Sequence, residues 1–560
     1  MKFLDKFKKS LVVLLLPMVS YGLLGPLEIF FGNTKDFNFG YTDFFWILAL
    51  IALVVWLFGA LVLAALPERI HKIANALVLG VGVGSYIQNM FMNIKLSEDD
   101  GSPMRWESLG SFTVINLLIW IVILILVVVA CVLLKKKWDM VSMAIAGFFS
   151  AIQLVAVLSL LLTSIGQENE SQIVQMSGKD QLKVASEENI IVFVLDTYGN
   201  TRLDETLSVY PDLLDGLQDF TYYDNADCHY YCTFPSMTHM LTGVDFDFDT
   251  ELSQQWLHDA WNSDRANSFY DTLKEENYSC RLYSGEVGYV YGNLRNLQQK
   301  YDNVVPMERI VDKKQVVKLM AKMSIYRYVP YVFKPRFEVL TQEYDTVVSY
   351  KEDVGVVDDN AMFYDMLTKN GLSVDQNVNN AFIVQHLFGL HLPYTMDENG
   401  MYAEEVSAEQ TAKGLTVIVN EYLAQLKELG VYDDATIIIT ADHGAWVGFD
   451  TQPIFMIKHA KETHDEMQVN SAPISLDDFQ ATILAVLGKE TTGFGTSIYD
   501  WNPGDIRERE VYMRTDDENY PEVKGSSFNV YYGYTYSGDR KNLDETIWDG
   551  PDVIVPATPW

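Results

Sequence analysis

A threonine at the start of an expected helix is the first residue whose setting suggests chemistry. Thr233 belongs to the stretch Cys232–Gly243. Pro235 suits the first helical position, because that position needs no N–H and proline already has a helical φ. Unpaired N–H groups and the positive end of the helix dipole favour an anion at such a start. The Thr233 hydroxyl could therefore attack a phosphate or sulfate centre, or be esterified by one. The alternative is an ordinary capped helix with a threonine in its lead-in loop.

Two short apolar runs supply acidic side chains that could work with this threonine. Asn189–Leu195 and Ala435–Ala441 are rich in β-branched residues, as buried strands are, and they end in Asp196 and in Asp442 and His443. Ligands of open parallel sheets bind outside the carboxyl ends of the strands, so these side chains lie where a site is expected. Carboxylate oxygens and an imidazole nitrogen suit Zn²⁺ or Mn²⁺. Such an ion would lower the pKa of the hydroxyl and screen an anionic ester.

Three features together resemble a known family: the strand that ends in Asp196, the Thr-x-Pro-Ser of Thr233–Ser236 and the Ala-Asp-His-Gly of residues 441–444. They are similar to the sulfatase branch of the alkaline phosphatase superfamily, and within it to membrane-bound lipoteichoic acid synthases and phosphoethanolamine transferases. The resemblance covers about residues 188–500. It implies a sulfatase-like α/β fold and one divalent metal ion, Zn or Mn, with Thr233 as the nucleophile. The implied metal ligands are Asp196, Thr233, Asp442 and His443.

The same resemblance extends to residues that would contact a substrate. His386 and His391 form a His-x₄-His-x-Pro-Tyr pattern, similar to the loop that these transferases place over the substrate phosphate. By this likeness His391 contacts the substrate or protonates the leaving oxygen, and His386 is the second candidate. The alternative is a pair of histidines satisfied in a surface loop. A looser likeness to the family's aromatic–Asn–Arg substrate segment adds the candidates Tyr291, Asn293 and Arg295. Lys458, which follows an apolar run, is a further candidate for contact with an anion.

The chain also departs from the family pattern. True sulfatases need a Cys or Ser that becomes formylglycine and an Arg four residues later, but these positions are Thr233 and Met237, which disfavours formylglycine chemistry. A second Asp normally follows the first in sulfatases, whereas Thr197 stands here and fits a single-metal transferase. Phosphoethanolamine transferases carry another His soon after Asp-His-Gly. This chain has Ala445–Phe449 and no His before His459.

The first third of the chain consists of apolar runs close to the roughly 20 residues that span a bilayer. None carries a charged side chain near its centre, so we expect an anchor and not a transport pathway. We predict five spans, at about Leu11–Phe31, Phe44–Leu66, Ile73–Asn93, Phe112–Leu134 and Met140–Thr163.

The charges between these runs predict their orientation. Lysines and arginines occupy alternate connections, with four lysines before the first run, Arg69 and Lys72 after the second, and Lys135–Lys137 after the fourth. By the positive-inside rule the amino terminus is cytoplasmic, and the chain after Thr163 lies outside the plasma membrane. A cleaved signal peptide is the alternative for the first run, and it would leave the later chain on the same side.

We expect four regions: a transmembrane domain at 1–163, a polar linker at 164–188, an α/β catalytic domain at 189–500 and a strand-rich extension at 501–560. An apolar stripe predicts a helix over Ala412–Leu429 that faces a sheet, directly before the strand that ends in Asp442. A second amphipathic helix is predicted over Asp477–Gly488, and alternation over Asn529–Thr535 predicts a small terminal sheet.

The composition excludes one class of partner. The formal net charge of −34 argues against nucleic acid, which needs a basic surface, and requires local positive features to attract any anionic substrate. Cys228, Cys232 and Cys280 follow the spans, an odd number that allows one disulfide without revealing which two residues form it.

These observations lead to one leading hypothesis. The chain is a membrane-anchored, metal-dependent transferase that moves a phosphoglycerol-like or phosphoethanolamine-like group from a phospholipid to an envelope glycan or lipid, through a Thr233 phosphodiester. Two alternatives stay open. One is a hydrolase of extracellular esters that uses the same site, either a phosphodiesterase or phosphatase or, as a weaker candidate, a sulfuric ester hydrolase. The other is an inactive binding module.

Overall fold

The computed structural model divides the chain into two compact units, one of residues 1–173 with 307–351 and one of residues 174–306 with 352–560. The described residues are 3–34, 37–93, 104, 106–163, 173–246, 253–285, 287–340, 343, 346–351, 353–444, 452–515, 530–538 and 547–554.

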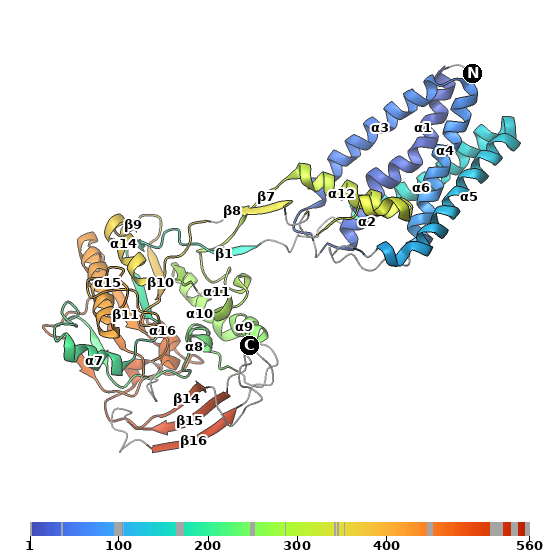
Figure 1. Cartoon of the computed structure of the whole chain (residues 1–560). Helices are drawn as coiled ribbons and strands as arrows, with labels where there is room; N and C mark the ends of the chain where they lie inside the picture. Colours follow the sequence, from blue (N-terminus) through green and yellow to red (C-terminus); the bar gives the residue numbers. More distant parts are fainter. Residues whose placement is uncertain are drawn as a thin grey trace. The chain divides into compact units, whose positions relative to one another are not determined.

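Long apolar helices make up most of the first unit (Figure 1). They are α1 (Phe3–Val19), α2 (Gly25–Gly32), α3 (Phe45–Ala65), α4 (Glu68–Ile87), α5 (Gly110–Leu134) and α6 (Trp138–Thr163). Within the described residues, four helical runs are long and apolar enough to cross a membrane: Phe3–Gly32, Phe45–Ala65, Glu68–Met92 and Gly110–Thr163. The last run contains the fourth and fifth predicted spans, separated by the 3₁₀ turn Lys135–Lys137. The count of five spans stays a prediction.

A segment from the middle of the chain belongs to this helical unit. Residues 307–351 form the antiparallel strands β7 (Glu308–Val311) and β8 (Val348–Lys351) and the helix α12 (Lys313–Tyr328). The buried side chains of Val316, Leu319 and Met320 join a cluster with apolar residues of α2 and α3, and this packing determines where α12 lies. The predicted catalytic domain of residues 189–500 thus differs from the observed unit, from which this segment is excluded.

The second unit is built around a seven-stranded sheet of order β13-β4-β12-β11-β3-β10-β5. Four adjacent strands are parallel to one another: β11 (Ala435–Thr440), β3 (Asn189–Leu195), β10 (Asn380–Leu387) and β5 (Tyr278–Tyr283), which lies at the edge. The remaining strands are β12 (Phe455–Lys458), antiparallel to β11, with β4 (Thr221–Tyr223) and β13 (Gln468–Asn470) beyond it. Because Leu195 pairs with Leu387 and Val194 with Thr440, three strands end at the same level.

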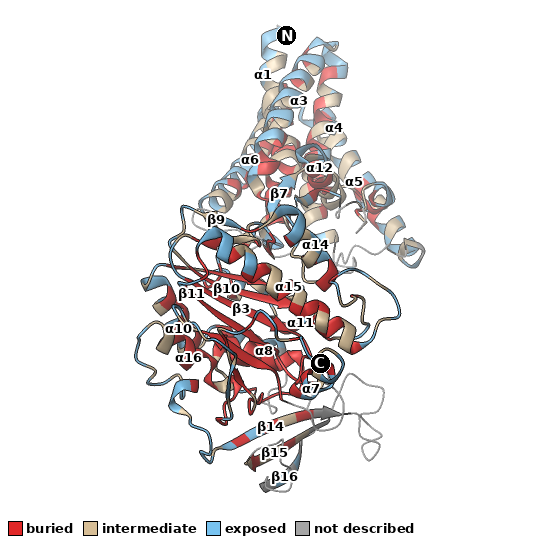
Figure 2. Cartoon of the chain, turned by 90° about the vertical axis from the view of Figure 1, so that its left-hand side faces the viewer, coloured by how far each residue is buried: buried red, intermediate tan, exposed pale blue. Residues whose placement is uncertain are grey.

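Helices cover both faces of this sheet, whose strands are largely buried except for the edge strand β13 (Figure 2). One face packs against α7 (Asn200–Val209), α14 (Asn360–Asn370) and α15 (Ala408–Leu429), and the other against α8 (Thr233–Thr242), α10 (Asp264–Glu275) and α16 (Phe479–Val486). Alternate residues of β3 serve the two faces, with Ile191 and Phe193 on the first and Val192 on the second. The expected α/β architecture is therefore present.

Helix α15 shows why the sequence folds this way. Ser407 caps its start with a reciprocal hydrogen-bond pair to Gln410, and Gly430 ends it with a φ of 75°. The predicted apolar stripe is buried against the sheet, as expected.

Smaller sheets complete the unit. A three-stranded antiparallel sheet contains β14 (Glu508–Thr515), β15 (Val530–Ser537) and β16 (Ile547–Ile554). Two short pairs, β1 (Val174–Met176) with β6 (Val304–Pro306) and β2 (Lys183–Ala185) with β9 (Ser373–Asp375), contain residues of the predicted linker, whose first part lies outside the described residues. The four cysteines are buried in this structure.

Two leucines of α15 test the importance of its packing. Leu423 is 2% exposed in the core, whereas Leu429, at the end of the same helix, is 36% exposed. We expect Leu423→Ala to cost about 2–5 kcal/mol because it leaves a cavity, and Leu429→Ala to cost well under half of that. Urea unfolding of the full-length protein in detergent, followed by tryptophan fluorescence, measures both. Equal losses would contradict this packing.

Candidate metal and nucleophile site

Acidic and imidazole side chains converge where the central strands end. Asp196 follows β3, Asp442 and His443 follow β11, and His386 is the second-last residue of β10. Ligand atoms of Asp196, His386 and Asp442 all lie within 4.8 Å of one another. His443 Nε2 is 3.7 Å from Asp196 Oδ1 and 3.5 Å from Asp442 Oδ2. Because three strands end at the same level, they bring together residues that lie far apart in the sequence.

The threonine predicted as nucleophile reaches this cluster. Thr233 begins α8, and Phe234 has an extended backbone (φ −97°, ψ 125°), so the regular helix starts at Pro235 as expected. The Thr233 hydroxyl donates a hydrogen bond to Asp196 Oδ2 at 3.4 Å. Ser236 Oγ, in the first turn, donates to the backbone carbonyl of Asp442 at 2.6 Å and ties α8 to the end of β11.

A second layer of hydrogen bonds orients the cluster. The N–H of Thr197 donates to Asp442 Oδ1 at 3.1 Å and its hydroxyl donates to Asp196 Oδ1 at 2.6 Å, so one residue bridges both carboxylates. His443 Nδ1 lies 2.7 Å from the Gly444 carbonyl oxygen. Because a carbonyl only accepts, Nδ1 carries a proton, and Nε2 faces the carboxylates.

The remaining imidazole of the cluster is held from a neighbouring strand. His386 Nδ1 lies 3.0 Å from Ser284 Oγ, which follows β5, and its Nε2 lies 3.8 Å from Asp196 Oδ2. The sequence prediction gave His386 only a substrate role, but its position makes it a further candidate metal ligand.

These side chains fit a divalent cation. Asp196, His386, Asp442 and His443 are each at most 5% exposed, and Asp442 Oδ2 is buried with no hydrogen-bond partner in the part of the chain that the structure describes. Burial would raise the pKa of Asp442, but the imidazoles of His443 and His386 and the N–H of Thr197 lower it below its usual value, so the carboxylate stays charged. Carboxylates and imidazoles suit Zn²⁺ or Mn²⁺.

His391 lies on the loop that follows β10. Its side chain is half-buried, its ring centroid lies 5.1 Å from that of Phe388, and its Nδ1 lies 2.7 Å from the Leu392 carbonyl oxygen. The preceding residue, Leu390, donates its N–H to the Asp196 carbonyl at 2.7 Å, so the loop is anchored at the cluster. Its predicted contact with substrate stays a prediction.

Two candidates of the aromatic–Asn–Arg segment have structural roles. Tyr291 is fully buried in the core, with its ring 6.2 Å from that of Trp261. Asn293 accepts the N–H of Arg295 and caps the short 3₁₀ turn Leu294–Asn296. Arg295 is exposed. The contacts described for these three residues do not connect them to the cluster.

Lys458 lies at the far end of the sheet. Because β12 runs antiparallel to β11, Lys458 pairs with Ile437 near the start of β11, away from Asp442. Its buried ammonium lies 3.0–3.4 Å from four backbone carbonyl oxygens, those of Tyr432, Asp433, Ala435 and His459, which accept its three N–H groups. Lys458 therefore stabilises this end of the sheet, and its predicted contact with substrate is not supported. The stretch Ala445–Phe449, noted for its lack of histidine, lies outside the described residues.

Comparison with known proteins gives a distant likeness of fold. The chain matches no established family profile and no curated protein sequence. Similar solved structures include a protein of the alkaline phosphatase superfamily from Vibrio parahaemolyticus (13% identity, 68% of this chain and 84% of that chain, TM-score 0.37). They also include the lipoteichoic acid synthase LtaP from Listeria monocytogenes (13%, 69% and 90%, TM-score 0.37) and the phosphonate monoester hydrolase SpPMH from Silicibacter pomeroyi (16%, 63% and 87%, TM-score 0.37). This likeness concerns the fold alone and not the reaction.

A glycine tests how closely the His391 loop must approach the cluster. Gly389 has a φ of +59°, and a Cβ there would lie 2.3 Å from both the backbone N and O of Asp196. We expect Gly389→Ala to displace the loop, lower the melting temperature and reduce bound metal several-fold. Gly430→Ala is the matched control, because φ is +75° there but nothing lies within 4 Å of an added Cβ, and it should cost only about 1 kcal/mol. Normal metal content in Gly389→Ala would contradict this role.

Proposed function

We propose that the chain is a membrane-anchored transferase that takes a phosphoglycerol-like or phosphoethanolamine-like group from a phospholipid and passes it to an envelope glycan or lipid. One observation supports it most strongly: the Thr233 hydroxyl donates to Asp196 inside a buried cluster of two carboxylates and two imidazoles. A hydroxyl in that setting is an activated nucleophile, the arrangement that covalent group transfer requires.

The proposed chemistry starts with the metal ligands. Asp196, Asp442, His443 and the Thr233 hydroxyl would hold one Zn²⁺ or Mn²⁺ ion, with His386 beside them. When bound, this ion would lower the pKa of the hydroxyl and neutralise charge on a phosphodiester. The N–H groups at the start of α8 favour the same anion.

The transfer steps use residues of the chain. Thr233 Oγ bonds to phosphorus while the bond from phosphorus to the diacylglycerol oxygen breaks. The proton of Thr233 passes to Asp196 Oδ2, its hydrogen-bond acceptor, and His391 gives a proton to the departing diacylglycerol. An acceptor hydroxyl then attacks the phosphorus of the Thr233 phosphodiester and gives its proton to His391. The bond from phosphorus to Thr233 Oγ breaks, and Asp196 returns its proton to Thr233.

The exposed apolar surface of the helical unit agrees with a phospholipid as the donor. Side chains along α3 and α5 are apolar and exposed, including Phe58 at 66% and Val132 at 63%, as lipid-facing residues are. The net charge of −34 gives no general attraction for anions, so the proposed site must recognise phosphate locally. In this proposal the protein lies in the plasma membrane, with a cytoplasmic amino terminus and an extracytoplasmic α/β unit.

Donor cleavage tests the proposal. The full-length protein is placed in vesicles with headgroup-labelled phosphatidylglycerol or phosphatidylethanolamine, and diacylglycerol release is measured. We expect Thr233→Val to lower the rate by about 10³-fold or more, because the nucleophile is lost. Thr238→Val should stay within a few-fold of the natural protein, since Thr238 is also buried on the same helix and, among the described residues, its hydroxyl donates to the Val290 carbonyl and not to the cluster.

The fate of the label separates the candidates. Label in a glycan or lipid acceptor supports the transferase. Label released as a free phospho-alcohol, with water as acceptor, supports the hydrolase instead. Cleavage that persists in Thr233→Val, or no cleavage by the natural protein with either lipid, would contradict the proposal.

A further inference from the structure

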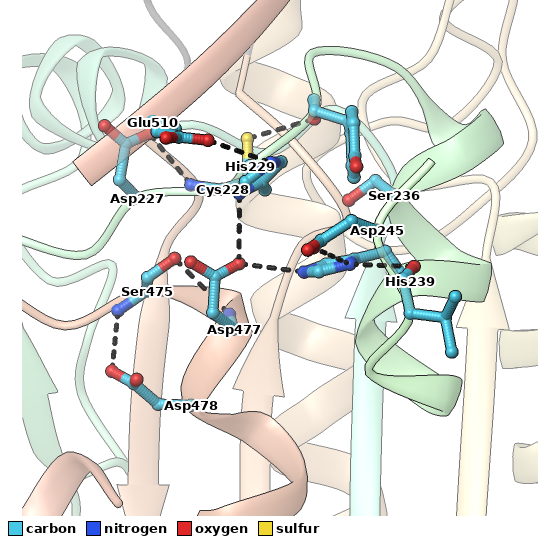
Figure 3. Close-up of polar contacts among 12 residues, drawn as sticks. Asp227, Cys228, His229, Ser236, His239, Asp245, Ser475, Asp477, Asp478 and Glu510 are labelled. Carbon is cyan, nitrogen blue, oxygen red and sulfur yellow. Dashed lines mark hydrogen bonds and ion pairs between the residues drawn. The ribbon is translucent and has the colours of Figure 1, made fainter. Parts of the chain in front are cut away.

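A second cluster of metal-ligating side chains lies beside the other end of α8 (Figure 3). His229 precedes the Thr233 stretch, His239 lies on the last turns of α8, and Asp477 lies in the 3₁₀ turn Leu476–Asp478. One ligand atom from each of these residues lies within 4.8 Å of the others. The reaction proposed above uses none of them.

The hydrogen bonds of His239 require a positive charge between this ring and Asp477. His239 Nδ1 lies 3.1 Å from the Val244 carbonyl oxygen, which can only accept, so Nδ1 carries a proton. Nε2 then faces Asp477 Oδ1 at 2.9 Å. A lone pair and a carboxylate repel at this distance, so either a second proton or a metal ion must lie between them.

His229 points a buried nitrogen into the same space. The residue is 9% exposed, and its Nδ1 has no hydrogen-bond partner among the residues that the structure describes. This atom lies 3.6 Å from Asp477 Oδ1, and His229 Nε2 lies 4.0 Å from Glu510 Oε2 on β14. A buried nitrogen left without a partner is costly, and coordination of a metal would satisfy it.

The separations of Asp477 from the two imidazoles are compatible with tetrahedral coordination. Two ligand atoms each about 2.0–2.1 Å from a tetrahedral zinc ion lie about 3.3 Å apart. The distances of 2.9 and 3.6 Å from Asp477 Oδ1 to the two imidazole nitrogens bracket that value. His239 also shows the outer contact that metal-bound histidines usually make, from Nδ1–H to a backbone carbonyl, with Asp245 Oδ1 3.4 Å away.

The neighbouring arginines do not take the place of a metal beside Asp477, because their short hydrogen bonds go to other groups. The Arg507 guanidinium is 3.9 Å from Asp477 Oδ2, but it forms its two short bonds, of 2.5 and 2.9 Å, with Asp478. Arg265 donates to Gln480 and to the Phe494 carbonyl. The Asp477 side chain is 32% exposed, which leaves a path for an ion from solvent.

We propose that His229, His239 and Asp477 bind a zinc ion, with water or Glu510 as the fourth ligand. The site would join three segments: the stretch before Thr233, the helix α8 and the turn before α16. His229 lies four residues before Thr233 and His239 six residues after it, so the ion would brace both sides of that threonine. This role is structural and holds whether the chain is a transferase, a hydrolase or neither.

Zinc stoichiometry of the full-length protein tests this site. The protein in detergent is stripped with a chelator, and zinc is added and counted after gel filtration. We expect two zinc ions per natural chain and one in Asp196→Asn/Asp442→Asn, in which the other cluster loses its carboxylates. Adding His239→Gln should remove the last ion, whereas adding His258→Gln should not, because His258 is exposed and its ring contacts Asn296 and Asn262, away from the cluster. Equal zinc in the two triple variants would overturn the proposal.

A second readout works without altering the new site. Cobalt(II) bound to Asp196→Asn/Asp442→Asn should show the visible absorption bands of a tetrahedral site with nitrogen and oxygen ligands, and zinc should displace it. Zinc should also raise the melting temperature of this variant by several degrees. Absence of both effects would contradict the site, even if His239→Gln fails to fold.

Discussion

Two carboxylates, Asp196 and Asp442, are buried at the ends of adjacent parallel strands, where their like charges must be compensated. The rest of the candidate site follows from this constraint. Thr197 hydrogen-bonds to both carboxylates, the imidazoles of His386 and His443 lie within 3.8 Å of them, and a divalent ion would complete the compensation. The register of β3, β10 and β11 makes the arrangement possible, because it ends these strands at the same level.

The sequence predicted the parts of this site that depend on local pattern. Asp196, Asp442 and His443 each follow a run of β-branched residues, so strand and site could be inferred together. Lys458 also follows an apolar run, but β12 is antiparallel, and strand direction depends on a partner that the local pattern does not specify. The sequence pattern assigns His386 to a loop, but the strand β10 extends to Leu387 and includes it. Periodicity does not locate the end of a strand this closely.

Long-range packing explains what else the sequence did not indicate. Helix α12 lies between elements of the α/β unit in the sequence, yet Leu319 and Met320 pack with α2 and α3. The His229–His239–Asp477 cluster likewise joins segments about 240 residues apart and has no local spacing signature. In both cases segments distant in sequence pack together, around α8 in the α/β unit and around α12 in the helical unit.

The proposed transfer depends on covalent attachment of a phospho-group to Thr233, and peptide mass spectrometry detects such an adduct. The full-length protein is loaded with Zn²⁺ or Mn²⁺, exposed to phosphatidylglycerol or phosphatidylethanolamine, quenched in acid and digested. We expect added mass of one phosphoglycerol or phosphoethanolamine group on the peptide that contains Thr233, and no added mass on this peptide in Thr233→Val. Diacylglycerol release with the adduct on another residue, or an adduct that persists in Thr233→Val, would contradict it.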